Sequence, residues 1–140
     1  MQRAPSRITA EEFETALRFG IPIMEKFSYR MECLEAGYAR FRMSFDERHI
    51  RPGGTVSGPL LVMVADAALY AMVMSVLGME LMAVTSNLNI HFLRKPAPTD
   101  VIAEATMLRR GRRTIVGHVL LYSEGLDEPI AQVTGSYAIP

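Results

Sequence analysis

Hydrophobic and polar positions alternate along most of this chain, and the period of the alternation predicts its elements. A period of two on either side of a turn at residues 35–37 predicts a hairpin with one buried face. The same period returns in the second half of the chain, between short polar turns, and predicts four more strands. The six predicted strands span residues 27–34, 38–45, 82–93, 100–109, 114–123 and 129–139.

Two segments break this period and predict helices. A short helix is predicted over about residues 9–20, because Thr9 and Glu12 form a capping-box pattern and Gly20 can end the helix. A long helix is predicted over about residues 58–77. From Pro59 onward it reads PLLVMVADAALYAMVMSVL, which is apolar on every side and therefore predicts a helix that is buried on every side.

These elements predict one α+β domain over residues 1–140. Six strands with one dry face each can form a curved antiparallel sheet that wraps around the long helix, with the short N-terminal helix beside it. A single sheet of this kind cannot cover the central helix completely. We therefore expect a second copy of the chain to bury the remaining surface.

Composition and charge exclude several classes of partner. The 15 basic and 15 acidic residues give no net charge, so a nucleic acid is not expected. The lone Cys33 excludes an internal disulfide, and we expect it to be a small core residue in a reducing compartment. The N-terminal residues lack the apolar run of a secretory signal, so a cytoplasmic protein is expected.

The apolar segment at residues 60–77 is long enough to span a membrane. However, an internal Asp66 costs about 3 kcal/mol on insertion scales. The segment also begins at a Gly-Pro turn without an interfacial aromatic residue, and the strand pattern around it requires a core. We therefore expect no membrane association.

Asp66 is the only charged residue in this apolar segment, which makes it the first candidate for a reactive group. A bare carboxylate in such surroundings is costly unless it has partners or a function. Upstream, residues 53–58 read GGTVSG and lead into the helix, whose unpaired N–H groups can bind a developing oxyanion. Because Pro59 has no N–H, Gly58 is the main candidate donor. A tight turn without any function would use the same glycines.

The spacing between Gly58 and Asp66 predicts how the chain assembles. Eight residues correspond to about 12 Å along a helix. A reacting carbonyl must lie about 3 Å from its oxyanion donor and close to the attacking group. The two residues of one chain therefore cannot serve the same carbon, whereas two antiparallel helices from two copies can. If both residues are catalytic, the protein is at least a dimer with two composite sites.

The loop, the acid and a later strand together resemble the hotdog-fold thioesterases, specifically their PaaI-like (phenylacetate-degradation) branch. That branch carries Asn-x-x-Gly-x-x-His-Gly-Gly before the helix, and an Asp eight residues beyond the first Gly of His-Gly-Gly. Here the corresponding stretch runs from Arg51 to Pro59, followed by Asp66. The strand NLNIHFLRKP, at residues 87–96, is similar to the branch's LNI-x-FLRP strand.

The resemblance implies hydrolysis of an acyl-CoA thioester by a homodimer or a dimer of dimers. No cofactor is implied, because coenzyme A is part of the substrate. It implies that Asp66 acts as general base on water or as nucleophile, that the Gly58 N–H polarises the carbonyl, and that Thr85 assists. Ser86 beside Thr85 is a candidate for substrate binding.

The chain departs from the family pattern in the loop. Ser57 stands at the His position, Pro59 at the second Gly, and Arg51 at the Asn position. An arginine near the partner's Asp66 could pair with it and quench a base, or could bind a carboxylate on the acyl group. Arg51 and Ser57 are both predicted to contact the substrate.

Other basic residues are candidates for the phosphates of coenzyme A, although a solvated basic turn is the alternative for each. The basic residues predicted to bind substrate in this way are Arg94, Lys95, Arg110 and Arg112. His49 is also predicted to bind substrate, because it lies in the loop before the long helix. No histidines have metal-ligand spacing, so no metal site is predicted, and His91 and His118 are expected to be plain strand residues.

Two other functions are compatible with the sequence. A non-catalytic acyl-CoA or acyl-ligand binding protein would keep the pocket, and Arg51 and Ser57 motivate this alternative. A dehydratase or hydratase on the same architecture would need a His paired with an acid. No His lies near Asp66 on the helix, so this alternative ranks last.

Overall fold

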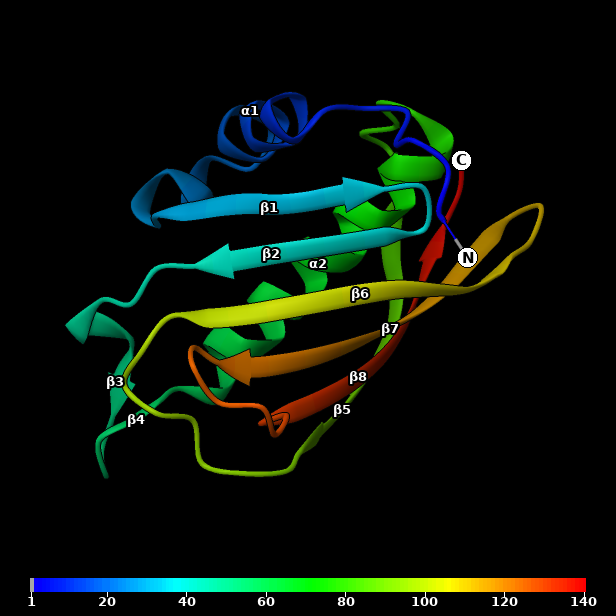
Figure 1. Cartoon of the computed structure of the whole chain (residues 1–140). Coiled ribbons are helices and arrows are strands. Elements are labelled where there is room, and N and C mark those ends of the chain that lie inside the picture. The colour runs from blue at the N-terminus through cyan, green and yellow to red at the C-terminus, as the bar shows by residue number, and fades with distance from the viewer. Residues whose placement is uncertain (1) are drawn as a thin grey trace.

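The structure, a computed structural model, describes residues 2–140. A six-stranded antiparallel sheet curls around the long helix α2, Gly58–Leu77, and α1, Ala10–Gly20, lies against β1 (Figure 1). The strand order is β1-β2-β6-β7-β8-β5, so that β1 and β5 form the edges. The strands are β1 Tyr29–Glu35, β2 Tyr38–Met43, β5 Val84–Phe92, β6 Val101–Arg110, β7 Thr114–Ser123 and β8 Ala131–Ala138. This confirms the predicted α+β architecture.

The short helix α1 begins as its capping pattern predicts. The N–H of Glu12 donates to Thr9 Oγ1 at 3.1 Å, and the N–H of Thr9 donates to Glu12 Oε1 at 2.9 Å. Several small elements were not predicted from the sequence. These are the 3₁₀ helices η1, Pro22–Lys26, and η2, Glu47–His49, and the hairpin of β3, Ile50–Arg51, with β4, Thr55–Val56.

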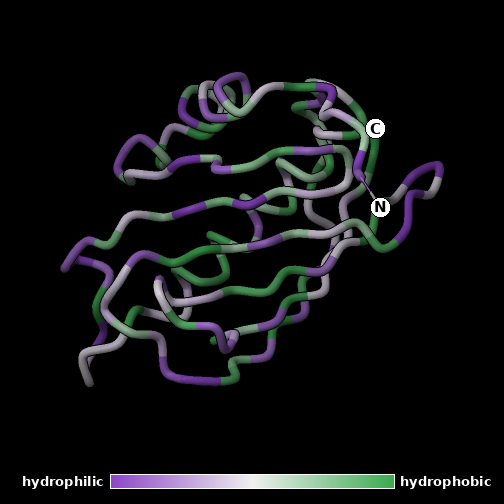
Figure 2. Tube along the Cα trace, in the orientation of Figure 1, coloured by the Kyte–Doolittle hydropathy of each residue, from purple (hydrophilic) through white to green (hydrophobic). Residues whose placement is uncertain are grey.

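The core lies between α2 and the inner face of the sheet. Figure 2 shows hydrophobic positions alternating with polar ones along the strands. Helix α2 is long and apolar enough to cross a membrane by length and composition alone, but 78% of its most apolar window is buried inside the molecule. It is the core helix that its all-round apolar sequence predicts.

Two glycines bring α2 close to the sheet. Gly117 of β7 and Gly135 of β8 are directly paired. A methyl group at Gly135 would lie 2.7 Å from both Leu69 Cδ1 and Leu88 Cδ2, and one at Gly117 would lie 2.9 Å from Leu69 Cδ2. The helix therefore packs on strand backbone, and any side chain at these two positions would push it away.

Cys33 was predicted to lie in the core, but it lies outside it. A bulge shifts the pairing of β1 with β2 between Met31 and Cys33. The extra residue turns Cys33 to the outer face, where it pairs with Arg40 and is half-buried, with its thiol 3.9 Å from Glu35. Simple alternation does not reveal a bulge, so the predicted inward orientation of Cys33 was wrong.

The outer face of the sheet carries an ion-pair network across β1, β2 and β6. Glu32 accepts hydrogen bonds from Arg40 at 2.9 Å and from Arg42 at 2.7 Å. Arg42 also pairs with Asp100 at 3.0 Å, and Arg40 with Glu104 at 3.2 Å. Burial acts to raise the pKa of Glu32, but the hydrogen bonds from Arg42 and Arg40 outweigh it and hold that pKa below its usual range.

Candidate active site

Asp66 lies in the third turn of α2 and is half-buried. Two hydroxyl groups donate to the same carboxylate oxygen. Thr85 Oγ1 lies 2.8 Å from Asp66 Oδ1, and the Tyr137 hydroxyl lies 2.6 Å from it. The structure therefore brings together Asp66 and Thr85, both of which were predicted from the sequence. It also adds Tyr137, which was not predicted.

A bulge in β5 determines which side chains reach Asp66. Thr85 pairs with Tyr137 on β8, the next pair joins Asn87 to Ser136, and Ser86 is the extra residue between them. Thr85 and Tyr137 therefore lie side by side on the inner face. The Ser86 hydroxyl bonds to Ser136 instead, 2.9 Å from its Oγ, and does not line the cavity at Asp66.

Tyr137 is held firmly in the interior. It is 4% exposed, and its ring stacks on Tyr70 with centroids 5.8 Å apart and planes 17° apart. Burial, followed by the negative charge of Asp66 and the hydrogen bond to it, raises the pKa of Tyr137 far above its usual value. The hydroxyl therefore stays protonated and serves as a donor. Alternation places Tyr137 on the inner face of the last strand, but it does not reveal this partner.

A cavity of about 660 Å³ opens in front of Asp66. Helix α1 and η1 form one wall, α2 the floor, and β5 with the segment before it the other wall. Asp66 is the only charged residue that lines it among residues 2–140. The volume lies within the range of small-molecule sites, which are mostly apolar with a few polar groups. The apolar lining includes Leu17, Ile21, Met24, Met63, Leu81 and Val84.

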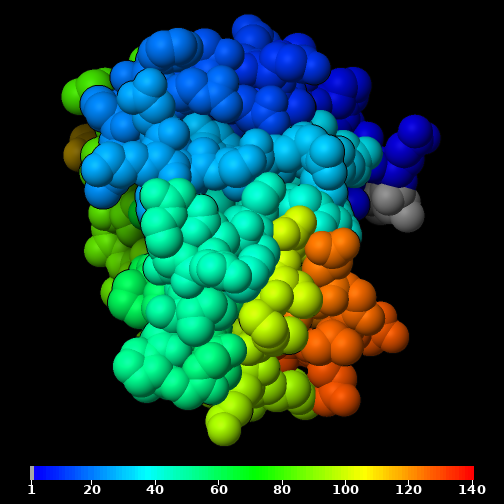
Figure 3. Space-filling view, turned by 90° about the vertical axis from the view of Figure 1, so that its left-hand side faces the viewer, coloured from blue at the N-terminus to red at the C-terminus, as the bar shows by residue number. Residues whose placement is uncertain are grey.

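A second hollow, of about 370 Å³, lies at the start of α2 around Gly58. Figure 3 shows the segment before α2 packed against the segment that follows β5 at this end of the molecule. Arg51, Arg94 and Lys95 line the hollow. The Phe92 ring covers Gly58 closely, because a methyl group on Gly58 would lie 3.4 Å from Phe92 Cζ. Three predicted substrate contacts are thus adjacent to the predicted oxyanion donor.

The two hollows have no lining residue in common. Gly58 therefore does not face the cavity that contains Asp66 of the same chain. This separation agrees with the distance of about 12 Å expected from helical rise. A reacting group that uses both residues must receive them from two different chains.

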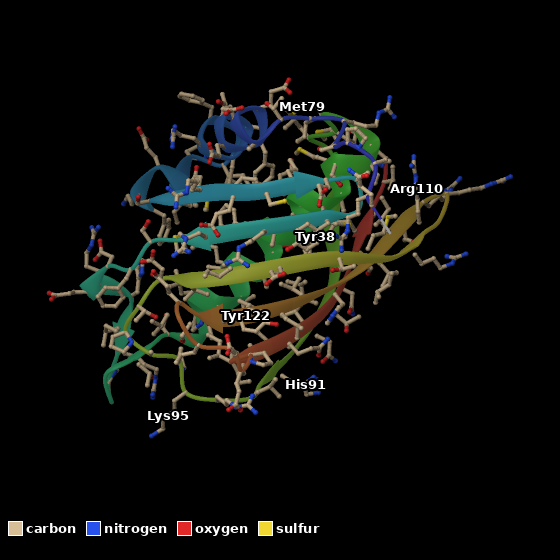
Figure 4. All side chains as sticks on the ribbon, viewed as in Figure 1. Tyr38, Met79, His91, Lys95, Arg110 and Tyr122 are labelled. Carbon is tan, nitrogen blue, oxygen red and sulfur yellow. The ribbon has the colours of Figure 1, made fainter. Side chains whose placement is uncertain are left out.

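The remaining predicted residues lie apart from Asp66. Ser57 is the N-cap residue of α2, and its N–H donates to the His49 carbonyl at 2.9 Å. The His49 ring packs against Phe27, with centroids 5.8 Å apart. Arg110 and Arg112 belong to the β6–β7 hairpin, and Figure 4 shows Arg110 and Lys95 at opposite ends of the sheet.

The histidines of the two long strands lie away from Asp66, on the other face of the sheet. His91 lies on β5 and His118 on β7, and both contact Gln132 on the outer face. Residues 2–140 contain no group of three or more His, Cys, Asp or Glu side chains that could hold a metal ion.

A curved antiparallel sheet around a long central helix is the hotdog fold, and comparison with known families agrees. Residues 53–130, more than half of the chain, match the thioesterase superfamily, and the chain belongs to this family. A solved structure from Silicibacter sp. TM1040, provisionally assigned as a thioesterase, is 37% identical with a TM-score of 0.84, covering 100% of this chain and 95% of that one.

Similarity extends to the PaaI proteins. A variant of the phenylacetic acid degradation protein PaaI from Thermus thermophilus is 26% identical with a TM-score of 0.75, covering 85% of this chain and 99% of that one. A Saccharolobus solfataricus protein, provisionally assigned as an esterase, is 28% identical over 109 residues, or 77% of this chain and 71% of that protein. These similarities confirm the predicted resemblance to PaaI-like hotdog proteins.

Proposed function

We propose that this protein hydrolyses an acyl-CoA thioester to the free acid and coenzyme A, with Asp66 as general base or nucleophile. One observation carries the proposal: Asp66, held by two hydroxyl donors, is the only charged group lining an apolar cavity among the described residues. Membership of the thioesterase superfamily supports thioester hydrolysis as the reaction class.

The chemistry requires one base and one oxyanion donor. As a base, Asp66 removes a proton from water while the water oxygen attacks the thioester carbonyl. The C–S bond then breaks, the proton held by Asp66 passes to the leaving coenzyme A thiolate, and the carboxylic acid is released with Asp66 ionised again. As a nucleophile, the Asp66 carboxylate attacks the carbonyl carbon, the C–S bond breaks, and coenzyme A leaves as the thiolate. Water then hydrolyses the mixed anhydride to the free acid and the Asp66 carboxylate, and the proton released in this step goes to the thiolate. In both routes the carbonyl oxygen becomes negative, and the Gly58 N–H at the helix N-terminus is suited to stabilise it.

We propose that Gly58 comes from a second copy of the chain, in a homodimer or a dimer of dimers. The separate hollows around Gly58 and Asp66 support this arrangement. The edge strand β5 supports it too, because Val84 is 56% exposed and Phe92 is 57% exposed. Natural proteins seldom leave such an edge uncovered. Pairing β5 with β5 of a second copy would set the two α2 helices antiparallel.

In such a pair, basic residues would lie at the entrance to each composite site. Arg51, Arg94 and Lys95 beside Gly58 would face the phosphates of coenzyme A while the acyl group enters the partner's cavity. Arg94 already donates to the Pro129 carbonyl at 2.7 Å, which holds its guanidinium in place. The β6–β7 hairpin of the other copy would lie at the same end, so Arg110 and Arg112 are further candidates.

The direct test is thiol release from a panel of short, medium and aryl acyl-CoAs, by the wild-type protein and Asp66→Asn. Loss of turnover in Asp66→Asn is expected. Equal rates for the two proteins at well-measured activity would reject hydrolysis through Asp66. Tight binding of acyl-CoA without turnover, unaffected by Asp66→Asn, would instead identify a non-catalytic binding protein.

The composite site has its own test, which is complementation between two inactive variants. Gly58→Pro removes the donor N–H, and Ser57 before it already has the extended conformation (φ −69°, ψ 145°) that a following proline requires. After mixing with Asp66→Asn and re-association, half of the dimers are mixed and each has one intact site. About a quarter of wild-type activity should return. Gly58→Ala keeps the N–H and is the control. No recovery would contradict a site shared between chains.

A further inference from the structure

The two oxygens of the Asp66 carboxylate have different surroundings. Oδ1 accepts both hydrogen bonds, from Thr85 at 2.8 Å and from Tyr137 at 2.6 Å. Among residues 2–140 no donor bonds to Oδ2. An ionised carboxylate can accept about four hydrogen bonds, two on each oxygen. The hydrogen bonds of the protein thus occupy one oxygen and leave the other available.

Tyr137 is suited to fix this orientation because its own position is fixed. Its strand, β8, lies between β7 and β5 inside the sheet. Its ring is stacked on Tyr70, whose hydroxyl donates to the Leu81 carbonyl at 2.8 Å. The Tyr137 hydroxyl also lies 3.1 Å from the Asp66 backbone carbonyl. Because Tyr137 cannot move with the carboxylate, a rotation of the Asp66 side chain would break the hydrogen bond between them.

We infer that Tyr137 is a positioning residue that, with Thr85, holds Asp66 so that Oδ2 alone reacts with water or with the thioester carbon. The inference rests on the proposed hydrolysis and assigns the reacting atom within it. Tyr137 transfers no proton in this assignment. Its proton stays on the phenol oxygen and remains bonded to Oδ1. The two hydrogen bonds favour the reaction because they keep the carboxylate in one orientation, and small errors in the orientation of a catalytic group reduce the rate steeply.

The test is Tyr137→Phe, which removes one oxygen atom and keeps the stacked ring. Loss of a hydrogen bond to a charged group predicts a fall in kcat of about 10- to 100-fold. KM, and the Kd of a non-hydrolysable thioether analogue of the substrate, should stay within about twofold of wild type. Tyr122→Phe removes the same atom on the outer face of the sheet and is the matched control (Figure 4). It should leave kcat unchanged.

The outcomes separate this inference from the proposed function. If Asp66→Asn abolishes turnover while Tyr137→Phe matches wild type, hydrolysis through Asp66 stands and the role of Tyr137 is rejected. Parallel losses of analogue binding and thermal stability in Tyr137→Phe would also reject it, because they indicate a structural role only. If Tyr137→Phe does not fold, Thr85 provides the second test. Thr85→Val, which lacks the hydroxyl, should lower kcat and leave KM unchanged. Thr85→Ser, which keeps the hydroxyl, should have the kcat of the wild type. Equal kcat values for Thr85→Val and Thr85→Ser would overturn the assignment of Oδ2.

Discussion

The apolar cavity in front of Asp66 predicts that a single substitution on α1 will change which acyl groups the protein accepts. Ala16 lines this cavity and is half-buried. Replacing it with leucine adds three carbon atoms to the wall. Leucine is nearly as favourable in a helix as alanine, so α1 should remain folded. The substitution therefore changes the shape of the cavity and leaves Asp66, Thr85 and Tyr137 in place.

The size of the effect follows from the burial of methylene groups. Each methylene of an acyl chain that leaves the cavity loses about 0.8 kcal/mol of transfer free energy, or about fourfold in kcat/KM. If the added carbons displace up to three methylenes, kcat/KM for long acyl chains should fall by up to about 60-fold relative to short ones. Acyl chains too short to reach the new side chain should be hydrolysed at the wild-type rate.

The assay is thiol release from a series of straight-chain acyl-CoAs of increasing length. Thr15→Leu is the matched control, because Thr15 neighbours Ala16 on α1 but is exposed and does not line the cavity. The optimum should move to shorter chains in Ala16→Leu and stay unchanged in Thr15→Leu. An identical chain-length profile in all three proteins would show that the acyl group does not occupy this cavity.

Two further predictions concern stability. Gly135→Ala should lower the free energy of unfolding by about 1–3 kcal/mol in urea titrations, because its methyl group would overlap Leu69. Gly20→Ala is the control, because its methyl group would meet nothing within 4 Å. Equal urea midpoints for the two variants would contradict tight packing of α2 on the sheet. Because the pKa of Glu32 is lowered by folding, its stabilisation is present above the unfolded pKa of about 4.3 and is lost as pH falls through the folded value. Between pH 7 and pH 3 the wild type should therefore lose more stability than Glu32→Gln, and a similar loss in both would contradict that role.

Much of the fold could be predicted because it depends on periodicity. A period of two identified the six strands, and an all-round apolar segment identified α2, since both patterns follow from which faces are buried. The bulges could not be found in this way. In β1 a bulge moved Cys33 to the outer face, and in β5 a bulge separated Thr85 from Ser86. An inserted residue shifts the alternation without any distinct sequence signal.

The candidate site was only partly predictable for a related reason. Asp66 is conspicuous because it is a charge in an apolar segment, and its distance from Gly58 follows from helical rise. Tyr137 is distant in sequence and carries no motif. Its contact with Asp66 depends on the order of strands, in which β8 lies beside β5. Sequence periodicity identifies the face on which a residue lies, but not the neighbour that the sheet topology gives it.

The wall formed by α1 and η1 lies outside residues 53–130, the part of the chain that matches the superfamily. If the acyl group occupies the cavity as proposed, one wall of the surface that selects it is encoded in a stretch of polypeptide separate from Asp66 and Thr85. An exchange of the first 26 residues between relatives should therefore transfer a preference for certain acyl groups without changing Asp66 or Thr85. Only part of that segment is open to such change, because Phe13, Leu17 and Met24 are buried in the core. Ala16 and Ile23 line the cavity and keep exposed surface, so they are the positions at which variation can reshape it without unpacking the domain.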